Sequence, residues 1–159
     1  MCDANGKCDS CSRTASTPGS GKILAYNIRM NGFGMLYSFA ELPSFVYTAG
    51  IEASWGHPEL IVFGLDYDSS TRLINETVRL IREGVSLDYQ GIDHGIEGMT
   101  VKLHEVPYDI AVRYMCETAT YYGEKRFRVL QLLWPDKQGR FPIEPGCSDN
   151  VKKAQPIIS

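Results

Sequence analysis

The stretch Leu60-Ile61-Val62-Phe63-Gly64-Leu65, with the segment that follows it, decides the fold of this chain. It is a nearly continuous apolar run of strand length, which is typical of a strand covered on both faces. Behind it, a helix is predicted from N-cap side chains at 68–70, from a stop at Gly84, and from an apolar stripe. The stripe consists of Leu73, Ile74, Val78 and Ile81. Together these signals predict helices packed on a sheet.

Upstream of this stretch, a helix is followed by two strands. Ile23, Leu24, Ile28 and Met30 have helical spacing, and Asn31-Gly32 ends the helix. Residues 35–39 and 45–51 are predicted strands. Residues 55–58, Trp-Gly-His-Pro, predict a loop, because proline lacks a backbone donor and disfavours helical geometry in the residue before it.

Downstream, residues 85–98 predict a long loop or an imperfect strand, and residues 99–106 alternate as in a half-exposed strand. A helix is predicted from Pro107 to Gly123, a strand over 127–134 and a short return strand over 140–143. This order predicts a single α+β domain with a mainly antiparallel sheet and two or three helices.

Composition agrees with one domain and excludes several classes of function. The chain has 159 residues, 43% hydrophobic and 22% charged, with a net charge of −3. The absence of a basic stripe argues against nucleic-acid binding, and no apolar stretch approaches the ~20 residues of a membrane span. With no secretory signal at the start, we expect a cytoplasmic protein. The expected organisation is a flexible tail over 1–21, a globular domain over 22–146 and a C-terminal tail over 147–159.

Three of the five cysteines lie in the first eleven residues, at Cys2, Cys8 and Cys11. The last two have the spacing with which two thiolates chelate a zinc ion, but a closed site needs a fourth ligand and no second pair of this spacing exists. A metal site, a redox or oligomer-linking role and an inert tail therefore remain open, and the inert tail is favoured.

Candidate binding residues lie where predicted strands end. Tyr47 and Thr48 precede Gly50, where a ligand can approach the backbone closely. His57 and Glu59 flank a proline between two strands and offer an acid-base pair. The favoured alternative is that Pro58 shapes a turn while both side chains bond backbone groups.

The last predicted strand adds Gln131, Trp134 and Asp136 to the candidates. A buried glutamine must satisfy several hydrogen bonds, so Gln131 either ties neighbouring strands together or faces a polar ligand. The sequence contains no phosphate-binding loop, nucleophile elbow, zinc-protease motif or dinucleotide fingerprint. Whether the protein is an enzyme is therefore left open.

Several separated segments together resemble a known family. They are Pro43-Ser44-Phe45-Val46-Tyr47-Thr48-Ala49-Gly50, Gly56-His57-Pro58-Glu59, Leu130-Gln131-Leu132-Leu133-Trp134-Pro135-Asp136 and Gly139-Arg140-Phe141-Pro142. In this order they resemble the bacterial family called domain of unknown function 4262, over about residues 22–146. The family pattern usually has an aromatic residue after the final proline, where this chain has Ile143. The resemblance implies a compact intracellular bacterial domain and no particular reaction.

A more distant resemblance concerns flavin-reductase-like split barrels, in which a strand followed by a helix N-terminus helps to hold the flavin phosphate. It implies a split-barrel-like fold with bound FMN, held here by Ser69, Ser70, Thr71 and Arg72. This flavin-binding oxidoreductase is the alternative function.

The leading hypothesis is a binding module for an unidentified protein or small molecule, and the sequence does not specify its oligomeric state. Its working surface is expected to join His57, Glu59, Trp134 and Asp136 in one groove.

Overall fold

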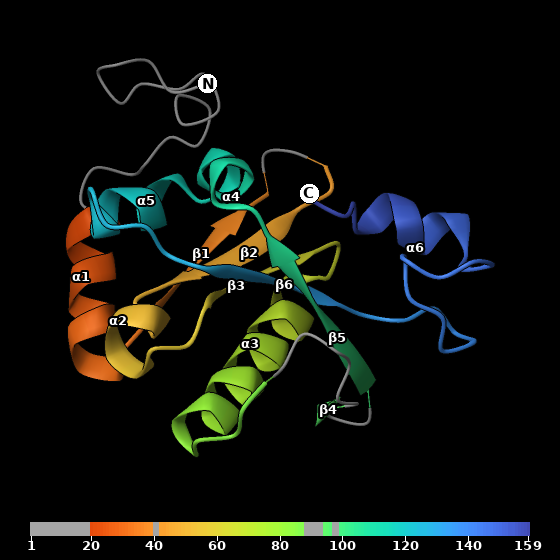
Figure 1. The fold of residues 1–159 in the computed structure, drawn as a ribbon, viewed down its shortest axis with the longest axis horizontal. Helices are drawn as coiled ribbons and strands as arrows, with labels where there is room; N and C mark the ends of the chain where they lie inside the picture. The colour runs from red at the N-terminus through yellow and green to blue at the C-terminus, as the bar shows by residue number, and fades with distance from the viewer. Residues whose placement is uncertain (1–19, 40–41, 88–93, 97–98) are drawn as a thin grey trace.

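A computed structural model of the chain describes residues 20–39, 42–87, 94–96 and 99–159 (Figure 1). Its centre is a sheet in which strands lie in the order β1-β2-β3-β6-β5-β4. Taken along the chain, the strands are β1 (Gly34–Ser38), β2 (Phe45–Ala49), β3 (Glu59–Phe63), β4 (His94–Ile96), β5 (Met99–Val106) and β6 (Val129–Leu133). The strand predicted over residues 60–65 is therefore confirmed at the centre of the sheet.

Among the strands that the structure describes, one neighbouring pair is parallel. β3 and β6 run side by side with Glu59 opposite Val129, and every other neighbouring pair is antiparallel. The predicted α+β fold with a mainly antiparallel sheet is confirmed. The split-barrel expectation is wrong, because β1 and β4 lie at opposite edges of the sheet order and do not pair with each other to close it.

Helices are more numerous than the two or three predicted. In the described part of the chain they are α1 (Ser20–Asn31), α2 (Ile51–Trp55), α3 (Tyr67–Arg82), α4 (Tyr108–Tyr114), α5 (Cys116–Tyr122) and α6 (Asp149–Ala154). The predicted helix from Pro107 to Gly123 is divided at Met115, whose backbone (φ −111°, ψ 56°) leaves the helical region. α2 and α6 are too short to show an apolar period in the sequence, which is why they were not predicted.

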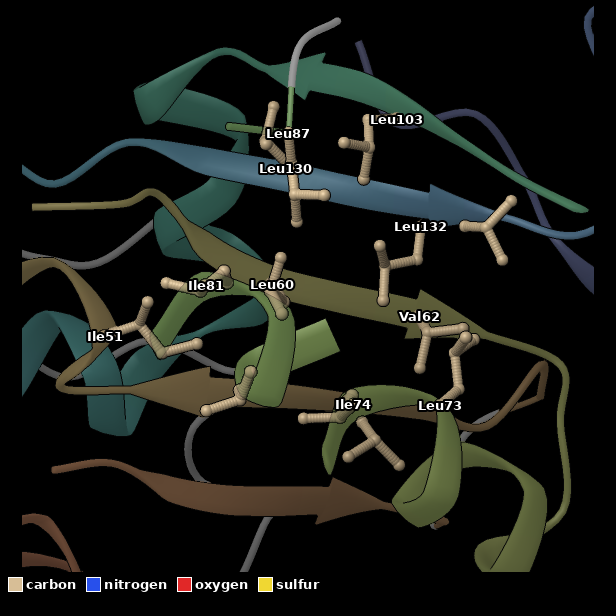
Figure 2. Packing of buried hydrophobic residues seen from close by; sticks show 13 residues of the cluster. Ile51, Leu60, Val62, Leu73, Ile74, Ile81, Leu87, Leu103, Leu130 and Leu132 are labelled. Atoms are coloured by element: carbon tan, nitrogen blue, oxygen red, sulfur yellow. The ribbon is translucent and has the colours of Figure 1, made fainter. Parts of the chain in front are cut away.

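The larger core lies between the sheet and α3, as Figure 2 shows. α3 begins at Asp66, whose carboxylate accepts the N–H of Ser69 at 2.8 Å, and its predicted apolar stripe is buried. The stripe faces side chains that project from one side of the central strands. They are Leu60 and Val62 of β3, Leu130 and Leu132 of β6, and Leu103 of β5.

The opposite face of the sheet is covered by α4, α5, α1 and the C-terminal segment. Tyr114 of α4 meets the rings of Phe45 and Phe63 edge-on, with centroids 5.7 and 5.6 Å away. α1 packs through Leu24 and other apolar residues onto β1 and β2. α1 lies close to β1 at Gly34, because a Cβ there would lie 2.5 Å from Cδ1 of Leu24 and the Leu24 side chain would have to shift to admit it.

Both ends of the chain were predicted to be tails. Residues 147–159, expected to be a tail, include α6 and pack against the sheet, where Ile158 is buried. Residues 140–143, expected to be a return strand, form no strand. The expected tail over 1–21 lies outside the described residues, except that Ser20 and Gly21 begin α1. No described helix is both long and apolar enough to cross a membrane.

Candidate functional site

Glu59, at the start of β3, is completely buried and its carboxylate accepts four hydrogen bonds. Thr48 Oγ1 donates at 2.6 Å, Tyr122 Oη at 2.5 Å, and the backbone N–H groups of Gly50 and Glu52 at 2.9 and 3.1 Å. Burial raises the pKa of Glu59, and the four donors partly offset this effect. The carboxylate therefore joins the end of β2, the start of α2 and the end of α5, with its donors all supplied by the protein.

Tyr47 and Thr48, predicted to meet a ligand, belong to the same buried network. The Thr48 hydroxyl accepts the N–H of Leu60 at 2.9 Å, and the Thr48 carbonyl accepts the Thr118 hydroxyl at 2.8 Å. Tyr47 donates its hydroxyl proton to Glu117 of α5. Burial raises the pKa of Tyr47 well above its ordinary value, so its phenol stays protonated. These contacts fasten α5 to the sheet.

One ring nitrogen of His57 is hydrogen-bonded to the backbone and the other is buried. Its Nδ1 donates to the Pro58 carbonyl at 2.8 Å, whereas its Nε2 is buried with no hydrogen-bond partner among the described residues. Burial lowers the pKa of His57 first, and the nearby Arg128 lowers it further. The imidazole is thus neutral at pH 7 and its free nitrogen is sealed from solvent.

Gln131 and Trp134 hold the C-terminal segment. The Gln131 amide donates to the Pro156 carbonyl at 2.8 Å and accepts the N–H of Ile158 at 3.1 Å. Trp134 exchanges two backbone hydrogen bonds with the Gln155 side chain, at 3.1 and 2.5 Å, and its indole donates to the Phe63 carbonyl at 2.9 Å. The Gln131 side chain thus bonds the C-terminal segment, where the sequence offered a tie between neighbouring strands or a polar ligand.

Asp136 organises the loop after β6. Its carboxylate accepts the N–H groups of Gln138 and Arg140, both at 2.9 Å, and that of Ser148 at 3.1 Å. The Arg140 side chain also contacts it at 3.3 Å. The N–H of Arg140, followed by those of Ser148 and Gln138, lowers the pKa of Asp136. The carboxylate is thus a loop anchor whose acceptors face the protein.

The lowered pKa of Asp136 predicts a pH-dependent contribution to stability. The unfolded chain takes up the proton near pH 4 and the folded chain only at lower pH, so the contribution is present above about pH 4. It is lost as the pH falls through the folded value. Asp136→Asn is therefore expected to lower the melting temperature at pH 7, and the difference from wild type is expected to shrink between about pH 5 and pH 3. Thermal melts at each pH measure this, and a constant difference would contradict it.

The four residues expected to share a groove are separated. His57 and Glu59 lie at the start of β3, whereas Trp134 and Asp136 follow the end of β6. Because β3 and β6 are parallel with Glu59 beside Val129, the two pairs lie at opposite ends of these central strands, roughly a strand length apart. The expectation of one common groove is wrong.

The N-terminus of α3, the predicted phosphate site, already carries an anion. Asp66 accepts both the N–H and the hydroxyl of Ser69, each at 2.8 Å. The Ser70 hydroxyl faces the Leu65 carbonyl and the Thr71 hydroxyl pairs with Tyr37 at 3.1 Å. A phosphate there would meet the Asp66 carboxylate, so the placement of Ser69, Ser70, Thr71 and Arg72 does not favour FMN.

The possible zinc ligands Cys2, Cys8 and Cys11 lie outside the described residues. Within the described ranges, no group of three or more His, Cys, Asp or Glu side chains is arranged to hold a metal ion.

A cleft of about 410 Å³ opens at the β1 edge of the sheet, between α1 and α3. We refer to it as the edge cleft. Its floor comes from one face of the β1 segment, its first wall from α1 and its second wall from α3. The lining residues are Asn27, Asn31, Phe33, Gly34, Met35, Tyr37, Asn75 and Arg82.

Four of the polar side chains that line the edge cleft have no hydrogen-bond partner in the described part of the chain. This holds for the amides of Asn27, Asn31 and Asn75 and for the guanidinium of Arg82. Tyr37, on the floor, is fixed by the hydrogen bond with Thr71 and by the Tyr67 ring, 4.8 Å away. The cleft thus combines an apolar, aromatic floor with polar groups that remain available, which is the usual composition of a small-molecule site.

Arg82 is held in place by aromatic contact. Its guanidinium lies over the Trp55 ring at 5.7 Å, and that ring contacts Phe33 with centroids 6.3 Å apart. Trp55 is itself confined, since a Cβ at Gly32 would lie 2.5 Å from its Cζ2. Stacking covers one face of a guanidinium and leaves its in-plane N–H donors free.

None of the edge-cleft residues was predicted as a site residue. The sequence does contain the spacing of these residues. Residues 27 and 31 are about one helical turn apart, and residues 33, 35 and 37 alternate as on one face of a strand. However, only the strand order reveals that β1 is an edge strand lying between these two helices.

Comparison with known proteins supports the resemblance noted from the sequence. The family described as domain of unknown function DUF4262 matches residues 27–148, which covers most of the chain. No curated protein and no solved structure shows a significant match. The matched segments meet in pairs, Thr48 and Gly50 with Glu59, and Asp136 with Arg140. The chain therefore belongs to the family of domain of unknown function DUF4262.

Proposed function

We propose that this protein is a small-molecule binding module whose ligand occupies the edge cleft. The observation that carries the proposal is the contrast between two sets of polar groups. Those of Glu59 and Asp136 are satisfied within the protein, whereas the amides and the guanidinium of the edge cleft have no partner among the described residues. A volume of about 410 Å³ falls in the range of about 300–1,000 Å³ that holds small ligands.

Benzamide is a suitable first probe, because it combines an aromatic ring for the floor with a neutral amide for the asparagines. Its titration into the ¹⁵N-labelled protein is expected to shift the backbone amides of residues 27–37 and 75–82 saturably. The double variant Asn31→Ala/Asn75→Ala is expected to weaken binding at least about fivefold, since each lost hydrogen bond contributes about 0.5–1.5 kcal/mol and the two together at least about 1 kcal/mol.

The matched control is Asn150→Ala, which removes an exposed asparagine from α6. Binding of benzamide should be unchanged in this variant. Shifts that are absent from the edge cleft, or equal affinity in the double variant and the wild type, would contradict the proposal.

A further inference from the structure

We infer that the edge cleft selects planar aromatic anions, with Arg82 as the group that binds the anionic oxygens and the floor as the surface that receives the ring. This inference rests on the proposed function and names the ligand class of the same cleft. It follows from the charge, the geometry and the surroundings of the lining residues.

The described residues that line the edge cleft carry positive charge and no negative charge. Among the described residues that form the edge cleft, Arg82 is a cation and none is an acid. The nearby acidic side chains of α3 are engaged elsewhere, since Arg79 pairs with Glu76 at 2.6 Å and with Glu83 at 2.5 Å. Arg82 therefore supplies an uncompensated positive charge at the cleft, which attracts anions and repels cations.

The donors of the edge cleft suit an oxyanion. The Arg82 guanidinium lies over the Trp55 ring at 5.7 Å, and its N–H groups form the planar fork that matches carboxylate or phosphate oxygens. The amide of Asn75 lies about two helical turns before Arg82 on the same face of α3, and it adds a neutral donor to the same wall of the cleft. An anion bound here would meet donors from a rigid helix.

The floor requires a planar group on the ligand. Phe33, Met35 and Tyr37 alternate along the β1 segment, so they present two rings and a thioether on one face. Tyr37 is stacked against Phe39, with centroids 5.9 Å apart and planes inclined by 14°. An anion without a ring would leave this surface exposed to water.

Three isosteric probes test the inference: benzoate, benzamide and benzamidine, which carry −1, 0 and +1 charge on the same ring. Benzoate is expected to bind about five- to tenfold more tightly than benzamide, and benzamidine more weakly than either, as one partly exposed charge-assisted contact predicts. Raising the salt concentration should reduce the preference for benzoate. Phenyl phosphate replaces benzoate in a parallel titration to distinguish phosphate from carboxylate, and inorganic phosphate tests the need for the ring.

Arg82→Gln is expected to abolish the preference for benzoate over benzamide while benzamide still binds. Arg113→Gln, which removes an exposed arginine from α4, is the matched control and should keep the preference. If benzamide binds in the edge cleft but benzoate binds no better, the inference is wrong and the proposed function stands. If no probe shifts the amides of the cleft, the proposed function fails as well.

Discussion

Glu59→Ala is expected to lower the free energy of unfolding by about 3–5 kcal/mol, which is at the upper end of the range for removing one buried polar side chain. The substitution removes the common acceptor of four donors and leaves a cavity between β2, α2 and α5. The donors include the N–H groups of Gly50 and Glu52, for which an alanine side chain offers no acceptor. Equilibrium denaturation in urea or guanidinium measures the change.

One further variant separates the hydrogen bonds from the loss of volume, and another serves as the control. Glu59→Gln keeps the size of the side chain but turns an N–H₂ group towards donors, so about 1–3 kcal/mol should still be lost. Glu124→Ala removes an exposed glutamate and should change stability by no more than about 0.5 kcal/mol. If the Glu59→Ala protein were as stable as the Glu124→Ala protein, the Glu59 carboxylate would not be what holds β2, α2 and α5 together.

The role of Glu59 links the family motifs to the edge cleft. Its carboxylate fixes the N–H groups at the start of α2, and α2 ends at Trp55, on which Arg82 stacks. The motif Gly56-His57-Pro58-Glu59 is thus connected to the cleft through Trp55, which contacts Arg82 of the α3 wall. A turn of this kind resembles an acid-base site in sequence because both roles use buried His and Glu side chains.

The strands and the long helix were predictable because burial imposes a period. Residues 60–63 are apolar without interruption because both sides of β3 are covered, and Leu73, Ile74, Val78 and Ile81 recur at helical spacing because one side of α3 is covered. Short elements escaped prediction since five residues of α2 do not complete two turns. The division at Met115 also escaped, because it is a backbone event within a continuous apolar pattern.

The candidate site was less predictable than the fold. Glu59 begins β3 and Trp134 follows β6, so these residues would lie close together only if the two strands ran antiparallel. The sequence does not say whether β3 and β6 are parallel or which strand lies at the edge. The prediction placed the binding surface at turns, where ligands are often bound in open sheets. Here the C-terminal ends of β3 and β6 are covered by the last residues of the chain, which are held by two hydrogen bonds between the Gln155 side chain and the Trp134 backbone.

Gly64→Ala is expected to release that end. Gly64 has φ +74°, and a Cβ at this position would lie 2.8 Å from the carbonyl carbon of Ala154, the last residue of α6, and closer still to its oxygen. The left-handed conformation costs a non-glycine residue about 1–2 kcal/mol, and overlap with a fixed backbone adds about 1–3 kcal/mol. We therefore expect a total loss of about 2–5 kcal/mol, with faster hydrogen exchange at Ile158, whose N–H is bonded to Gln131.

Gly56→Ala separates the two contributions to this loss. Gly56 has nearly the same φ, +69°, but a Cβ there would meet no atom within 4 Å, so only the conformational cost of about 1–2 kcal/mol applies. The difference between the two variants therefore measures the close approach of Gly64 to α6. If both variants lose equal stability and exchange at Ile158 is unchanged in each, α6 does not pack on the end of β3 in solution. The C-terminal ends of β3 and β6 would then be open to a ligand. The structure would no longer favour the edge cleft over Trp134 and Asp136 as the binding site.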